Sequence, residues 1–149
     1  MRHKKSIALT ACLVSIPILT GCPSGSGNNN NNQNGVAPGS LQGHTISVSV
    51  NGGALPFSNT GSYVFTPAGT GNSGTYQLSG AGGPQSNIGN YTYSGNGNMG
   101  NLVETEQSGT LVNNTLTFNT TNSGTIYSSS PTSGPGGVGG FESGTFTLN

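Results

Sequence analysis

The chain has 149 residues, and 84 of them are Gly, Asn, Ser or Thr (27, 19, 20 and 18 respectively). It has only three basic residues, three acidic residues and no Trp. So few charges exclude a coiled coil, a nucleic-acid binder and an ordinary helical domain, and they leave few titratable groups for acid–base chemistry.

The first 21 residues have the pattern of a secretory signal. All three basic residues lie within the first five positions, and an apolar stretch from Ile7 to Leu19 follows them. A basic start, a short apolar run and small residues before a cleavage point are typical of such signals. The run is shorter than the roughly 20 apolar residues of a membrane-spanning helix. We therefore predict that residues 1–21 are removed from the mature protein.

The signal ends in four residues, Leu19, Thr20, Gly21 and Cys22, which resemble a bacterial lipobox. In lipoproteins of that type the signal is cut before the cysteine, and the new N-terminal cysteine carries the lipid. The resemblance implies that Cys22 anchors the chain to a membrane through its acyl chains. Pro23 replaces the aspartate that is typical of inner-membrane retention, which favours the outer membrane of a bacterial cell envelope. The alternative is an ordinary secretory signal followed by a chance cysteine.

The charge of the mature chain restricts its partners. No Lys or Arg follows the signal, and the acidic residues are Glu104, Glu106 and Glu142. Without a basic patch to bind phosphates, nucleic acid and anionic lipid headgroups are poor partners. Because Cys12 is lost with the signal and Cys22 is acylated, we expect no disulfide and no cysteine metal site. No metal or other cofactor is predicted.

Residues 22–40 are expected to form an acylated, disordered tether. The segment is rich in Gly, Ser and Asn and includes five consecutive asparagines, Asn28 to Asn32. Such a composition offers too little apolar surface to bury for a folded structure. As a flexible coil, residues 23–40 span about 23 Å on average, which holds a small domain away from a bilayer.

From residue 41 to residue 149 the sequence consists of short runs with a period of two, bounded by Gly, Asn or Pro. Such alternation is typical of half-buried strands, and no segment shows a helical period of 3.6 residues. We predict eight strands, within residues 45–50, 62–66, 75–79, 90–94, 101–106, 110–120, 124–128 and 143–148. Asn51-Gly52 is expected to form a turn, and Ser128 to Gly140 a flexible loop. The predicted fold is all-β, a small antiparallel eight-stranded barrel or sandwich.

Three segments after Gly89 carry a resemblance to a known group: Tyr91 to Asn98, Leu116 to Thr125 and Ser143 to Leu148. Their strand-and-turn pattern resembles bacterial β-domains of the calycin type, the lipocalin-like group that includes the MoaF-like proteins. The Gly-x-Trp signature of typical lipocalins is missing because the chain has no Trp. The resemblance implies an up-and-down antiparallel barrel that can enclose a pocket, and it implies no particular ligand.

Four aromatic residues are candidate ligand contacts. Tyr63 shares a strand face with Phe65, and Tyr91 shares one with Tyr93. Aromatic rows of this kind line pockets or stack on sugar rings, although more often they form the core of a small β-domain.

Glu104 and Glu106 are two residues apart on an expected strand and therefore share a face. Paired carboxylates occur in glycosidases and in cation sites. We favour the simpler interpretation that both face solvent and keep the strand soluble. That interpretation leaves Leu102 on the solvent-facing side with them.

Two further motifs are expected to be structural. His44, the only histidine after the signal, lacks the partners of a catalytic triad or a zinc site and is expected to be exposed before the first strand. Gly-x-Gly-x-x-Gly occurs at residues 69–74, 95–100 and 134–139. This motif binds phosphate only where a helix follows it, so we expect turns.

These features predict a non-catalytic, membrane-anchored envelope lipoprotein whose β-domain is a surface or binding module. One alternative is a calycin-like carrier that binds a small apolar ligand in an aromatic-lined barrel. A less favoured alternative is a glycan-active hydrolase that uses Glu104 and Glu106. The expected partners are the membrane, through the acyl chains, and a small apolar ligand, a glycan or a protein.

Overall fold

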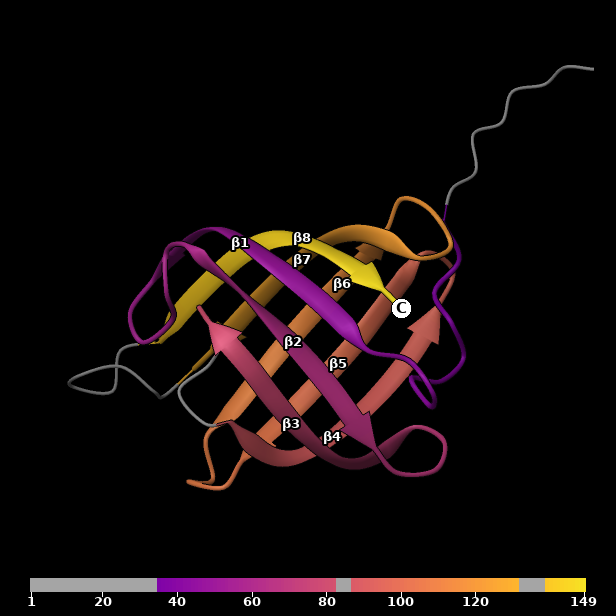
Figure 1. Ribbon diagram of the computed structural model, residues 1–149, viewed down its shortest axis with the longest axis horizontal. Helices are drawn as coiled ribbons and strands as arrows, with labels where there is room; N and C mark the ends of the chain where they lie inside the picture. Colours follow the sequence, from indigo (N-terminus) through magenta and orange to yellow (C-terminus); the bar gives the residue numbers. More distant parts are fainter. Residues whose placement is uncertain (1–34, 83–86, 132–138) are drawn as a thin grey trace, which may run out of the picture. The chain divides into compact units, whose positions relative to one another are not determined.

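A computed structural model describes residues 35–82, 87–131 and 139–149. They form a closed barrel in which each strand pairs antiparallel with the next and β8 pairs with β1 (Figure 1). The strands are β1 (Ile46–Ala54), β2 (Gly61–Ala68), β3 (Ser73–Ala81), β4 (Ile88–Asn96), β5 (Met99–Glu106), β6 (Leu111–Phe118), β7 (Ser123–Ser130) and β8 (Gly140–Leu148). The all-β prediction with eight strands is confirmed, as a barrel and not a sandwich. The predicted signal, the lipobox and the asparagine run lie outside the described residues.

The ladder between β1 and β8 closes the barrel, and it contains one irregularity. Val50 pairs with Gly144, whereas Gly52 pairs with Ser143, so Asn51 is an extra residue in β1. The turn predicted at Asn51-Gly52 is therefore wrong, because the extra residue is absorbed as a β-bulge and β1 continues to Ala54. A glycine beside an asparagine suits a bulge as well as a turn.

Two of the three Gly-x-Gly-x-x-Gly segments contain hairpin turns, as expected. Gly71 in the β2–β3 turn and Gly97 in the β4–β5 turn have φ angles of 83° and 58°. These values lie in the left-handed region that glycine adopts without steric cost. The third segment lies almost entirely outside the described residues. Within the described part of the chain, no helix is long and apolar enough to cross a membrane.

The strands alternate between a buried and a solvent-facing side, and their buried sides form one core. The apolar core residues on the strands are Ile46, Val48, Val50, Tyr63, Phe65, Tyr76, Leu78, Tyr91, Tyr93, Leu102, Leu116, Phe118, Ile126, Phe146 and Leu148. Phe65 stacks on Tyr76 with ring centroids 5.1 Å apart and meets Tyr91 edge-on at 5.7 Å. Such ring pairs add stability beyond the area that they bury.

The segment before β1 covers one end of the barrel. Residues 35–40, which were expected to belong to the tether, lie against the turns at that end. The Ala37 amide donates to the Gly97 carbonyl at 2.9 Å, and Ser40 Oγ donates to the Gly71 carbonyl at 2.9 Å. Leu41 is completely buried in the core, and His44 is only partly exposed. The packed part of the chain thus includes residues assigned to the tether from their composition.

We predict that Leu41→Ala lowers the free energy of unfolding by about 2–4 kcal/mol, because it leaves a cavity where the side chain is fully buried. Val36→Ala is the control, because Val36 is 63% exposed and its truncation should change stability by less than about 0.5 kcal/mol. Urea denaturation of both variants measures the difference. Equal stabilities would show that Leu41 does not support the barrel.

Candidate functional site

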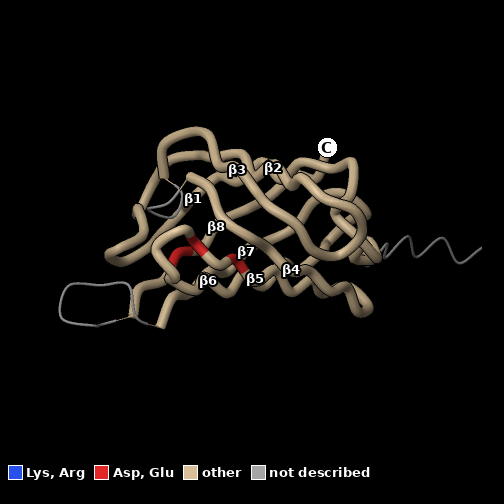
Figure 2. Tube along the Cα trace, turned by 90° about the horizontal axis from the view of Figure 1, so that it is seen from below, with Lys and Arg blue, Asp and Glu red and all other residues tan. Residues whose placement is uncertain are grey.

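All three acidic residues of the described chain lie inside the barrel, near the end where β5 finishes and β8 begins (Figure 2). Glu104 is 2% exposed and Glu142 is completely buried, while Glu106 is also buried. The prediction that Glu104 and Glu106 face solvent is therefore wrong. Leu102 is buried on the same side of β5, and the strict alternation of a strand places both carboxyl groups inside with it.

Neutral donors bind the buried carboxyl groups. Tyr63 donates its hydroxyl hydrogen to Glu142 Oε1 at 2.7 Å, and Ser128 Oγ donates to the same oxygen at 3.3 Å. Asn114 Nδ2 donates to Glu104 Oε1 at 2.8 Å and to the Leu102 carbonyl at 3.2 Å. These bonds satisfy one oxygen each of Glu142 and Glu104; the first set links β2, β7 and β8, and the second links β5 and β6.

Ser128 and Asn114 were missed as site residues. Ser128 was expected to begin a flexible loop, but β7 continues to Ser130 and both serines are buried. Of the predicted loop, residues 132–138 lie outside the described residues. The signal for Ser128 was its period of two with Ile126, which continues the buried face past the expected end of the strand.

Several buried polar atoms of the barrel interior have no hydrogen-bond partner among the described residues. They are Glu104 Oε2, Glu142 Oε2, Asn114 Oδ1 and the hydroxyls of Tyr76, Tyr91 and Tyr93. The described chain also contains no Lys or Arg to neutralise a carboxylate. A buried, unpaired charge is so unfavourable that the group takes up a proton instead.

Burial shifts the acid–base equilibria in that direction. It raises the pKa of the Glu104 carboxyl to about 8, against the opposing hydrogen bond from Asn114 and with support from the nearby Glu142. Burial also raises the pKa of Glu142, although the hydrogen bonds from Tyr63 and Ser128 oppose the rise. For the Tyr63 hydroxyl, burial and the carboxylate of Glu142 raise the pKa well above its usual value. Glu104 is thus largely a neutral acid at pH 7.

The predicted ligand contacts Tyr63, Phe65, Tyr91 and Tyr93 are all buried in the core. The structure brings them together with the carboxyl groups, since Tyr91 pairs with Glu104 across β4 and β5. In the described chain, no three His, Cys, Asp or Glu side chains are arranged to hold a metal ion. The interior therefore combines aromatic rings with buried carboxyl groups.

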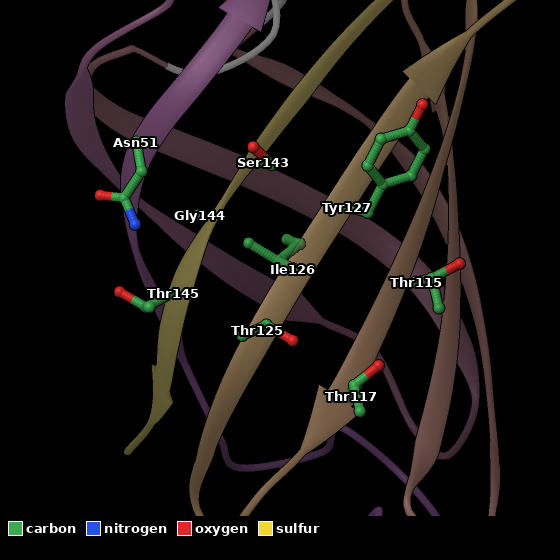
Figure 3. Close-up of a pocket in the computed structure, with 9 residues that line it drawn as sticks. All are labelled: Asn51, Thr115, Thr117, Thr125, Ile126, Tyr127, Ser143, Gly144 and Thr145. Atoms are coloured by element: carbon green, nitrogen blue, oxygen red, sulfur yellow. The ribbon is translucent and has the colours of Figure 1, made fainter.

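A separate hollow of about 360 Å³ lies on the outside of β6, β7 and β8 (Figure 3). Its lining residues are Asn51, Thr115, Thr117, Thr125, Ile126, Tyr127, Ser143, Gly144 and Thr145. Seven of these nine carry a hydroxyl or an amide side chain. Tyr127 is 51% exposed and stacks on Phe141 with ring centroids 6.2 Å apart and planes 18° apart. Tyr127 was not predicted as a site residue, because Thr115 and Ser143 become its neighbours only through strand pairing.

Two other hollows have no exposed aromatic ring. One of about 380 Å³ lies beside the β1–β2 connection and contains Phe57, and one of about 350 Å³ lies over β1–β3 and contains Tyr63. Both of these aromatic residues are buried. The hollow at Tyr127 is therefore the strongest candidate of the three for a surface binding site.

The described residues define an up-and-down, closed antiparallel β-barrel whose outer face carries no Lys, Arg, Asp or Glu side chain. No protein family model, curated protein or solved structure matches this chain. Its chemistry therefore has to be inferred from the interior acids and the outer hollow themselves.

We predict that the barrel loses stability as the pH rises from about 5 to about 8. An unfolded Glu titrates near 4.3 and folded Glu104 near 8, so the folded state binds the extra proton in this range. The stabilisation from the proton on Glu104 is complete below the pKa of the unfolded state and is lost as the pH rises through the pKa of the folded state. The free energy of unfolding should fall by up to about 1.4 kcal/mol per pH unit for one such group. Urea denaturation across this range measures the slope.

The matched control for the pH dependence is Glu104→Gln. It keeps an oxygen that accepts the hydrogen from Asn114 Nδ2 but has no titrating proton. In this variant the free energy of unfolding should depend less steeply on pH, and the pH dependence due to Glu142 should remain. A wild-type barrel with the same unfolding free energy at both ends of the range would contradict the prediction.

A pair of tyrosine variants separates paired from unpaired buried hydroxyls. Tyr63→Phe removes the shorter hydrogen bond to Glu142 and should lower the free energy of unfolding by about 1–3 kcal/mol. Tyr93→Phe removes a buried hydroxyl without a partner among the described residues, so stability should stay the same or rise. Chemical denaturation at one pH compares the two variants, and equal losses would refute the assignment.

Proposed function

We propose that the chain is a non-catalytic, membrane-anchored lipoprotein of the bacterial cell envelope and that its barrel is a binding module. The observation that carries the proposal is where the charges lie. Every basic residue belongs to the first five positions, directly before the apolar run and the lipobox. Every acidic residue is buried in the barrel. The mature chain thus offers a lipid for attachment and an uncharged surface for binding.

The burial of the carboxyl groups argues against the hydrolase alternative. A glycosidase needs two carboxyl groups that reach the scissile bond from opposite sides. Glu104 is instead 2% exposed, and Asn114 binds it from within the barrel. Glu106 is buried beside it and accepts a hydrogen bond from Ser108 at 3.1 Å. These contacts support a structural role for both residues.

The contacts of residues 35–40 shorten the proposed tether. Because Ala37 and Ser40 bind the end of the barrel, the free spacer after Cys22 is at most residues 23–34. A flexible coil of that length spans about 19 Å on average. Pro23 supports the outer membrane as the site of anchoring.

A carrier for a small ligand inside the barrel is the second candidate. The buried hydroxyls of Tyr91 and Tyr93 favour it, because they have no partner among the described residues. The resemblance of the chain after Gly89 to calycin-like domains supports the same hypothesis. A ligand in the interior would have to displace packed rings such as the Phe65–Tyr91 pair, so we favour binding on the outer face.

Acylation at Cys22 is the direct test of the anchor. Cells that express the protein are labelled with a palmitate analogue, and the purified chain is assayed for the label. Wild type and the control Cys12→Ser should both incorporate the label, because Cys12 lies in the part of the signal that is removed. Cys22→Ser should incorporate none. Equal labelling of Cys22→Ser and wild type would refute the lipoprotein assignment.

A further inference from the structure

The outer face of the described barrel carries no side chain of Asp, Glu, Lys or Arg. Among the described residues, the side chains of Asp, Glu, Lys and Arg are represented by the three buried glutamates alone. Figure 2 shows these acidic positions together at one end of the barrel and no basic position on the described chain. An ionic ligand would find no opposite charge to offset the loss of its hydration. The chemistry of this face therefore selects neutral partners.

The hollow over β6–β8 presents polar groups from three neighbouring strands. Thr125 pairs with Thr117 on one side and with Thr145 on the other, and all three side chains line the hollow (Figure 3). Tyr127 likewise lies between Thr115 and Ser143 in the register. Hydroxyl groups both donate and accept hydrogen bonds, as the hydroxyls of a sugar do. An apolar partner would bury these groups without partners, which is unfavourable.

The Tyr127 ring supplies the apolar contact that such a ligand needs. It is half exposed, lines the hollow and stacks on Phe141. Aromatic rings provide a large contact area at a low cost in conformational entropy, and the Tyr hydroxyl adds a polar group. A flat ring beside rows of hydroxyls matches the two kinds of surface on a sugar, the C–H face and the rim of hydroxyls.

We infer that the hollow bounded by Tyr127, Thr125 and Ser143 binds a neutral glycan. The inference deepens the proposed binding module, since it names the ligand class and the face that binds it. The volume of the hollow, about 360 Å³, suits a short segment of a glycan and not a whole polymer. A polysaccharide would therefore cross the sheet with one segment bound in the hollow.

Affinity electrophoresis of the full, lipidated protein in detergent micelles tests the inference. Gels contain neutral polysaccharides of glucose, mannose or galactose, and retention is compared with a gel that has none. Wild type should be retained by at least one polysaccharide, and salt between about 0.05 and 0.5 M should not change the retention. Absence of retention in all three gels, or retention that is lost in salt, would overturn the inference.

Variants then locate the site by titration with oligosaccharides of the retained type. Tyr127→Ala should weaken binding about tenfold, as expected for an aromatic anchor, while Tyr127→Phe should keep most of the affinity. Thr125→Val removes one hydroxyl at constant shape and should also weaken binding. Thr92→Val is the matched control, because Thr92 is an exposed threonine on β4 outside the hollow. Wild-type affinity in both Tyr127→Ala and Thr125→Val would overturn the assignment.

Two controls separate loss of glycan binding from loss of stability and from self-association. Tyr127→Ala should still unfold cooperatively, with a slightly lower midpoint because it loses the contact with Phe141, and Thr125→Val tests the site independently of that loss. Self-association that Tyr127→Ala abolishes, without any glycan binding, would assign the hollow to a contact between copies and overturn the inference. Cys22→Ser leaves the hollow intact, so a failed acylation test and a failed glycan test are distinguishable.

Discussion

The hydrogen-bonded ladder between β1 and β8 is the interaction on which the rest of the structure depends. It pairs the first and last strands of the barrel, from Ile46 with Leu148 to Ala54 with Phe141, and it removes both edges of the sheet. Once the sheet is closed, alternate residues of every strand face either a sealed interior or water. A carboxyl group that shares the parity of a core residue then has no route to the surface, as Glu142 shows in the same strand as Phe146.

Closure without basic residues determines how the interior acids are accommodated. The described chain has no Lys or Arg to pair with the interior acids, so hydrogen bonds and protons have to stabilise Glu104 and Glu142. Asn114, Ser128 and Tyr63 each donate to one carboxyl oxygen, while the second oxygens have no described partner. Folding and proton uptake are therefore linked, and the two ends of the barrel differ in character. At the other end of the barrel, the buried side chain of Leu41 covers the core.

The strands and their turns could be predicted because their signals are local. Alternation over five or six residues and intervening glycines identified all eight strands. The strand pattern alone left a barrel and a sandwich open, since closure depends on a pairing between residues about 100 positions apart, such as Ile46 with Leu148. The burial of Glu104 had a usable signal in Leu102, but the general preference of carboxylates for water was given more weight. Ala37 was assigned to the tether because a Gly- and Asn-rich composition does not reveal a tertiary contact.

The candidate glycan surface was beyond local patterns for the same reason. Thr125, Tyr127 and Ser143 become neighbours only when β7 and β8 pair in one register. On such a surface, exchanging water for sugar hydroxyls replaces hydrogen bonds with similar ones, and the net gain from each exchange is small. Net affinity must therefore come from the exposed apolar ring of Tyr127, which gains more from contact with a sugar than from contact with water. An uncharged β-face of this kind gains its selectivity from where it places an aromatic residue, and the hydroxyls around the ring set the orientation of the ligand.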